Sequence, residues 1–181
     1  SHERIKLLPA STALATLERQ SPGQSGLGLV IAKSLAQLWG EFDHAVIDSP
    51  PLLGILMVNA LAASQQLVIP VQTEFLAVKG LERMVSTLAM INRSRKQALP
   101  YLIVPTLFDR RTQASMSTLR ALRNSYPEQL WPAYIPVDTR LRDASRAGLT
   151  PSQFDPNCRA VLAYRALLKH LLSLQPTAQV A

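Results

Sequence analysis

Cysteine is almost absent from this 181-residue chain, because Cys158 is its only one, so no disulfide can form within it. Histidine is scarce, and its three residues do not combine with Cys158 in the spacing of a zinc site: His2, His44 and His170. The longest apolar run, residues 52–63, is broken by a glycine and an asparagine and falls short of the roughly 20 residues that span a bilayer. No segment has the pattern of a secretory signal. These absences predict a cytosolic location and the absence of a metal site built from histidine and cysteine.

Acidic side chains are scarce in the second half of the chain. Residues 1–90 carry six basic and seven acidic side chains, whereas residues 91–181 carry thirteen basic and five acidic side chains. Such asymmetry favours a polyanionic partner, nucleic acid before membrane, and the alternative is a basic surface that only maintains solubility. With 48% hydrophobic and 17% charged residues, disorder and coiled coil are excluded. The length predicts one domain, residues 1–181.

Apolar periodicity predicts strands that alternate with helices along the whole chain. The expected strands are residues 5–8, 44–47, 67–71, 101–108 and 131–137. The expected helices are residues 12–20, 29–39, 55–63, 74–93, 113–126, 138–146 and 157–174, with Gly148 as the cap after the sixth. This alternation predicts an α/β fold with a mostly parallel sheet and helices on both faces.

Polar residues that follow the strands are the first place to search for a site, because ligands bind at the carboxyl edge of such sheets. Asp48 follows the apolar run at 44–47, in HAVIDSPPLLG. A carboxylate at this place can orient a magnesium-bound water in phosphoryl transfer. The alternative is an aspartate that only begins a turn before Pro50 and Pro51.

The context of Asp48 resembles the Walker B region of the ParA/MinD partition ATPases, over FDHAVIDSPPLLGILMVNALAASQQLVIPVQTEFLAVKGLERM. Three later segments resemble other motifs of that family in the same order: TLFDRRTQAS, YIPVDTRLRDAS and FDPNCRAVLAYRALLKHL. The resemblance runs from about Ile5 to Leu172. It implies a P-loop ATPase of the ParA-like branch that forms an ATP-dependent dimer and binds DNA nonspecifically to position cargo.

The resemblance also implies roles for individual residues. Asp48 would be the Walker B carboxylate and would hold Mg²⁺ through water, with Pro50, Pro51 and Gly54 shaping the loop behind it. Phe108, Asp109 and Pro136 would lie near the nucleotide base. Arg111 and Arg140 match positions that the family uses against DNA. Arg142 and Arg146, four residues apart on one expected helix, extend that set. The implied partners are DNA and a ParB-like or cargo adaptor protein, in the cytoplasm at the nucleoid.

The departures from the family concern the phosphate site. The chain contains no G-x-x-x-x-G-K-[ST] motif, and the second family aspartate is absent too. ATP and Mg²⁺ are therefore expected in a full-length protein and not in this chain alone. Because the chain begins with Ser1, we expect an N-terminally truncated piece of a longer ATPase. The alternative is a natural adaptor without a P-loop that binds DNA or a ParA partner without hydrolysis. Ser145 and Ala147 replace a proline and a histidine of the family pattern, which affects the detail of the base pocket.

A second family alternative is a MinD-like ATPase that cycles on membranes. The final helix is rich in leucine, but the segment SLQPTAQVA after it carries no charge, so we expect this helix to pack in the core and to form no stable membrane anchor. Without the phosphate-loop strand, exposed strand edges predict self-association or a homodimer.

Overall fold

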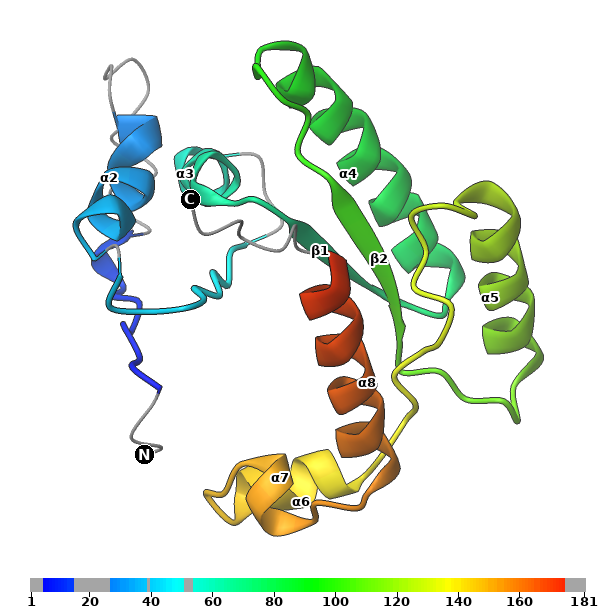
Figure 1. Cartoon of the computed structure of the whole chain (residues 1–181). Helices are drawn as coiled ribbons and strands as arrows, with labels where there is room; N and C mark the ends of the chain where they lie inside the picture. Colours follow the sequence, from blue (N-terminus) through cyan, green and yellow to red (C-terminus); the bar gives the residue numbers. More distant parts are fainter. Residues whose placement is uncertain (1–4, 15–26, 39, 51–53, 175–181) are drawn as a thin grey trace. The chain divides into compact units, whose positions relative to one another are not determined.

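The computed structural model describes residues 5–14, 27–38, 40–50 and 54–174 (Figure 1). The chain divides into two compact units, a first unit of residues Ser1–Gln65 and a second unit of residues Gln66–Ala181. The expectation of a single domain stays a prediction. Among the helices in the described ranges, none is long and apolar enough to cross a membrane.

The second unit is built on a parallel pair of strands. β1 (Leu67–Gln72) pairs with β2 (Tyr101–Thr106) in a register that sets Leu67 opposite Tyr101 and Gln72 opposite Thr106. The expected strand at 131–137 lies along the other edge of β2 as an extended segment. It is held there by backbone bonds that include Trp131 N–H to Ile103 O at 2.8 Å and Ile135 N–H to Pro105 O at 2.8 Å. It forms only isolated bridges, so it extends the sheet without being a regular strand.

Prolines in both strands occupy positions where a missing N–H does not break the β1–β2 ladder. Leu67 and Thr73 donate toward β2, so the N–H groups of the odd-numbered β1 residues point that way and Pro70 lies on the alternate, outer side. In β2, Ile103 donates to Gln129, so Pro105 has its nitrogen on the side of the extended segment. This placement explains how two proline-containing sequences form paired strands.

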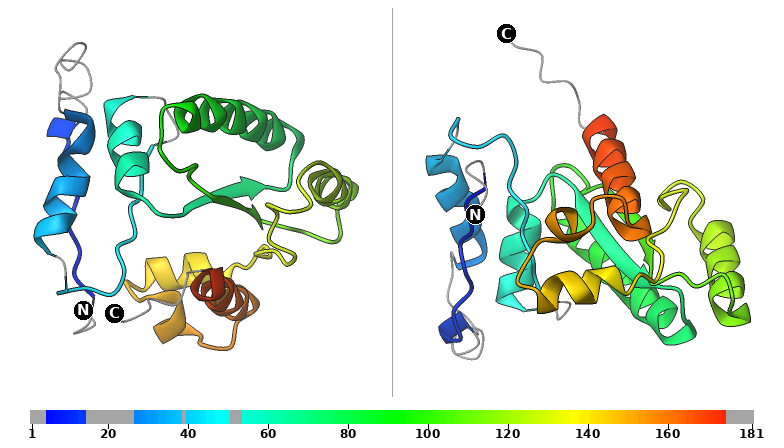
Figure 2. Two further views of the ribbon diagram at one scale, coloured as in Figure 1. Left: turned by 45° about the horizontal axis from the view of Figure 1, so that its top comes forward. Right: turned by 90° about the horizontal axis from the view of Figure 1, so that it is seen from below.

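Helices cover both faces of this sheet, as the left view of Figure 2 shows for α4 and α8. One face packs against α4 (Phe75–Arg93) and α5 (Gln113–Ser125), and its buried core is Ile69, Val71, Leu81, Ile103, Leu122 and Leu130. The other face packs against α8 (Arg159–Leu174), and its buried core is Leu102, Val104, Trp131, Ile135 and Leu167. Neighbouring residues of β2 point to opposite faces, which explains why its apolar run is continuous. The prediction of an α/β fold with a parallel sheet and helices on both faces is confirmed.

Two short helices connect the extended segment to α8. α6 (Arg140–Arg146) is followed by Gly148, whose φ of 67° is the left-handed conformation expected of a glycine after a helix. α7 (Pro151–Phe154) was not expected from periodicity, because a single turn has none to show. Its start is marked by Thr150 and Gln153, which form a capping box.

The first unit contains η1 (Leu27–Leu29), α2 (Val30–Gln37) and α3 (Ile55–Ala63), which pack against one another. Asn59 of α3 connects the two α-helices. Its Oδ1 accepts the backbone N–H of Val30 at 2.8 Å and of Ile31 at 3.3 Å, and its Nδ2 donates to Ile55 O at 3.0 Å. A side chain on one helix thus satisfies the first donors of another, which an N-cap residue ordinarily does.

Two expected strands of the first unit do not form. Residues 5–8 and 44–47 are without regular secondary structure, and Val46 is 97% exposed. Their apolar composition is typical of buried strands, but a strand also needs a hydrogen-bonded neighbour, and in the described ranges only β1 and β2 form a ladder. The expected helix at 12–20 falls largely outside the described residues, as does Trp39 at the end of the expected helix 29–39.

Candidate functional site

The first unit holds the expected Walker B segment. Asp48 and Pro50 are exposed in a stretch without regular secondary structure, so the structure does not place Asp48 at the end of a strand. Gly54 is the residue before α3, and its carbonyl accepts Val58 N–H at 3.1 Å. Its φ of −136° is available to any residue. Pro51 lies outside the described residues.

The donors in this chain do not by themselves make a site for ATP and Mg²⁺. In the described ranges no cluster of three or more histidine, cysteine, aspartate or glutamate side chains is suited to hold a metal ion. Mg²⁺ is often held by one or two carboxylates together with substrate phosphates. Asp48 supplies one carboxylate, but the chain has no glycine-rich phosphate loop.

The second unit brings together the residues expected near a nucleotide base. Phe108 follows β2 and forms a bridge with Pro136 of the neighbouring loop. Phe108 N–H donates to Ile135 O at 3.1 Å, and Val137 N–H donates to Phe108 O at 3.0 Å. The Phe108 side chain is only 6% exposed, and its ring lies against that of Tyr134, with centroids 4.1 Å apart. Phe108 is therefore a packing residue of this edge, whereas Asp109 reaches the surface.

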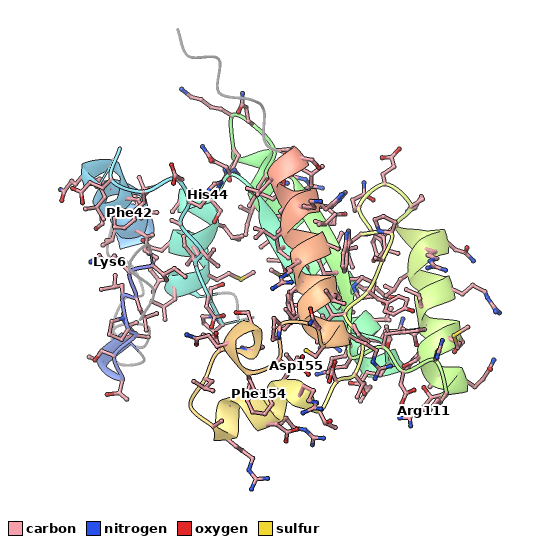
Figure 3. The ribbon with its side chains drawn as sticks, turned by 60° about the horizontal axis from the view of Figure 1, so that its bottom comes forward. Lys6, Phe42, His44, Arg111, Phe154 and Asp155 are labelled. Carbon is pink, nitrogen blue, oxygen red and sulfur yellow. The ribbon has the colours of Figure 1, made fainter. Side chains whose placement is uncertain are left out.

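Asp109 is bound closely by Arg111, which lies at the surface beside the start of α5 (Figure 3). The Arg111 guanidinium donates Nε–H to Oδ1 at 2.9 Å and Nη2–H to Oδ2 at 2.7 Å, a bidentate pair. The side-chain hydrogen bond from Arg111, followed by the backbone N–H of the same residue, lowers the pKa of Asp109 to about 2. Asp109 is therefore a carboxylate at every physiological pH, and Arg111 is partly neutralised although its side chain is 82% exposed.

Buried hydroxyls join the end of β1 to the first turn of α5. Thr73, just after β1, and Ser115, in the first turn of α5, are 4% and 6% exposed, and their hydroxyl oxygens are 2.9 Å apart. The backbone N–H of Asp109 donates to Ser115 Oγ at 3.4 Å. Leu107, between β2 and this network, has a φ of 50°, a left-handed conformation that is unfavourable for a leucine. The loop at 107–109 is thus held in shape by its contacts.

The loop before α6 is fixed by Asp138. Burial raises the pKa of this carboxyl, but backbone donors at Ala160 and Arg140 and the charge of Arg159 together leave the pKa below its ordinary value. Its Oδ2 accepts Ala160 N–H at 3.1 Å and its Oδ1 accepts Arg140 N–H at 3.1 Å. Arg140 Nε lies 3.6 Å from Asp155 Oδ2.

The expected DNA-binding arginines therefore fall into two groups. Arg111 and Arg140 have carboxylate partners, whereas Arg142 and Arg146 on α6 are exposed and form no ion pair with any described residue. Two further exposed arginines on α5, Arg120 and Arg123, also have no ion pair within the described ranges. Sequence reasoning did not select them, although their spacing of three on one helix face was visible in the sequence.

Comparison with known proteins agrees with this geometry. The AAA domain family model (AAA_31) matches residues 1–101. Sporulation initiation inhibitor protein Soj of Bacillus subtilis (strain 168) is 28% identical over 170 residues, which cover 93% of this chain and 67% of that protein. Chromosome partitioning protein ParA of Myxococcus xanthus is 27% identical over 169 residues, which cover 93% and 60%.

A solved structure resembles the fold as well. Cobyrinic acid a,c-diamide synthase from Mycobacterium smegmatis, with a bound ATP analog and magnesium, matches with a TM-score of 0.71 and 29% identity over 93% of this chain and 64% of that one. The parallel sheet with helices on both faces is that of a P-loop NTPase. Within that class, the chain belongs to the ParA/MinD family of partition ATPases. It spans about two thirds of the length of the curated relatives it matches.

Proposed function

We propose that this chain is part of a ParA-like ATPase that acts in DNA partitioning or intracellular cargo positioning, and that its basic C-terminal half binds DNA without sequence preference. Family membership supports the general activity. The partners that fit this role are DNA, a ParB-like or cargo adaptor protein and a second copy of the chain, in the cytoplasm at the nucleoid. ATP and Mg²⁺ belong to the full-length protein, with Asp48 as the Walker B carboxylate.

The observation that carries the DNA proposal is the pair of exposed arginines on α6 that have no carboxylate partner among the described residues. Arg142 and Arg146 lie one turn apart on α6, so their side chains share a helix face. A guanidinium without an ion pair binds a phosphate without first giving up a carboxylate, whereas Arg111 must release Asp109. We therefore assign the larger share of DNA binding to Arg142 and Arg146 and a smaller share to Arg111 and Arg140.

The expected binding is electrostatic and weak. Arginine contacts with phosphate release counterions and do not read bases, so affinity falls steeply with salt and changes little with sequence. Nonspecific complexes in general have a Kd on the order of 10⁻⁴ to 10⁻⁶ M at physiological salt. For ATP we expect no micromolar affinity in calorimetry of this chain with Mg-ATP, because it lacks the phosphate loop.

Fluorescence anisotropy with two unrelated duplexes over a range of salt concentrations tests the DNA proposal. Arg142→Ala with Arg146→Ala is expected to weaken binding to both duplexes. It should also reduce the slope of log K against log salt concentration by about 2, because each lost phosphate contact removes about 0.9 from that slope. Arg111→Ala with Arg140→Ala should reduce both quantities less. Lys79→Ala is the matched control, because Lys79 is an exposed cation already paired with Glu82. If a variant lacking all four arginines keeps the original affinity and slope, these four residues do not form the DNA-binding face.

A further inference from the structure

Asp138 joins the starts of two helices of the second unit. Its Oδ1 accepts the N–H of Arg140, the first residue of α6, and its Oδ2 accepts the N–H of Ala160, the second residue of α8, both at 3.1 Å. The first N–H groups of a helix have no partner within the helix, so one carboxylate here satisfies a donor of each. Loss of that carboxylate would therefore release both helix starts at once.

Two further contacts connect the same parts of the chain. Arg140 Nε lies 3.6 Å from Oδ2 of Asp155, the residue that follows α7 (Figure 3). From α8, Arg159 Nη2–H donates to the carbonyl oxygen of Val137 at 3.4 Å. Residues 137–140 are thus held against residues 155–160 by side chains that come from both segments.

The same packing sets the rotation of α6 about its axis. Ala144 is completely buried, and Leu141 packs against the buried cluster at the start of α8. Successive residues of an α-helix are about 100° apart, so Arg142 and Arg146 point away from the face that holds Leu141 and Ala144. Both arginines are exposed. The attachment of α6 to α8 therefore determines the direction in which the two arginines point.

The charge of Asp138 acts against DNA binding. A carboxylate close to a face that binds phosphates repels them, and residues 91–181 contain only five acidic side chains. By charge alone, removal of Asp138 should tighten the binding of a polyanion. If Asp138 instead holds α6 in its place, its removal should weaken that binding. The two effects have opposite signs, so they can be distinguished by experiment.

We propose that Asp138 is a positioning residue for DNA binding, which holds α6 so that Arg142 and Arg146 reach the phosphates of one duplex together. This inference rests on the DNA proposal above. Asp138 itself does not contact DNA and acts only through the two arginines. Without it, a smaller fraction of molecules presents both arginines, and the apparent Kd rises by the inverse of that fraction.

Three variants in the anisotropy assay test this role. Asp138→Ala removes the charge and both acceptor oxygens, whereas Asp138→Asn removes the same charge and keeps one acceptor oxygen. Asp143→Ala is the matched control, because Asp143 lies on α6 and forms no ion pair with any described residue. We expect Asp138→Ala to bind duplex DNA at least about threefold more weakly than the original chain. Asp138→Asn should lie between the two, and Asp143→Ala should bind as tightly as the original chain or more tightly.

A double-mutant cycle separates positioning from a general loss of structure. In a chain that already carries Arg142→Ala with Arg146→Ala, Asp138→Ala should no longer weaken binding, because the side chains that it positions are gone. Circular dichroism checks that each variant is folded. If Asp138→Ala does not fold, Asp138→Asn provides the same test, since it too must bind more weakly than Asp143→Ala.

Two results would overturn the positioning role alone. One is binding by Asp138→Ala that is unchanged or tighter, and the other is an equal loss of affinity with and without Arg142 and Arg146. A different result would overturn the DNA assignment of α6 and this inference with it, namely unchanged binding by Arg142→Ala with Arg146→Ala.

Discussion

β2 of the second unit and the segment at 44–47 of the first have similar apolar composition but opposite surroundings. Ile103 of β2 is completely buried between two hydrogen-bonded neighbours and under helices, whereas Val46 is 97% exposed. The difference is the neighbour, because β2 has β1 on one edge and residues 129–137 on the other. Apolar pattern therefore indicates where a strand can form, and a hydrogen-bonding partner determines whether it does.

The largest expected effect separates these two positions directly. Ile103→Ala removes a fully buried side chain from the core against α4 and α5, so we expect it to lower the free energy of unfolding by about 2–5 kcal/mol. Val46→Ala should change it by less than about 0.5 kcal/mol, since its side chain is already in water. Urea unfolding measures both. A comparable loss in Val46→Ala would mean that residues 44–47 are packed like β2.

A smaller effect tests what holds the first unit together. Asn59→Ala leaves the N–H groups of Val30 and Ile31 without their acceptor, and a lost cap of this kind costs about 1 kcal/mol. We expect faster amide exchange at both residues and little change in β1 and β2. Asn59→Asp keeps an acceptor and should retain most of the protection. Unchanged exchange in Asn59→Ala would show that the cap is not needed.

The smallest effect concerns acid and the Asp109–Arg111 pair. Folding lowers the pKa of Asp109 from 3.8 to about 2, so the stabilisation it brings is fully present above about pH 4 and is lost as pH falls through about 2. The free energy of unfolding of Asp109→Asn should therefore fall less steeply between pH 4 and pH 2 than that of the original protein. Between pH 5 and pH 8 the two proteins should show the same pH dependence. Thermal unfolding across this range measures it. Identical acid profiles for the two proteins would contradict the pairing.

Much of the second unit could be predicted from the sequence, because its patterns are local and long. α4 was expected at 74–93 and observed at Phe75–Arg93, and the strand expected at 67–71 is β1 at Leu67–Gln72. In the first unit, the helix expected at 55–63 is α3 at Ile55–Ala63. Phe108 and Pro136, which the family resemblance assigned to the same site, form a bridge, because adjacent parallel segments end at one edge of a sheet; their place near a nucleotide base stays a prediction.

What could not be predicted depends on contacts between distant residues or on side-chain geometry. The cap that Asn59 gives to α2 joins it to Val30, which is 29 positions away, and to Ile31, which is 28 positions away. No local sequence motif encodes such a distant contact. The pairing of Arg140 with Asp155 depends on how α6 and α7 fold back, which charge counts do not show. The left-handed backbone conformation of Leu107 could not be predicted from the sequence, because leucine rarely adopts that conformation.

Hydrogen exchange with and without duplex DNA at low salt tests the account most directly, since it reports both the fold and the binding face. Without DNA, we expect slow exchange in β1 and β2 and rapid exchange at residues 44–47. With DNA, exchange should slow at residues 110–113 and 140–146 and stay unchanged at residues 40–50. Slow exchange at 44–47 without DNA, or protection by DNA confined to the first unit, would contradict the account.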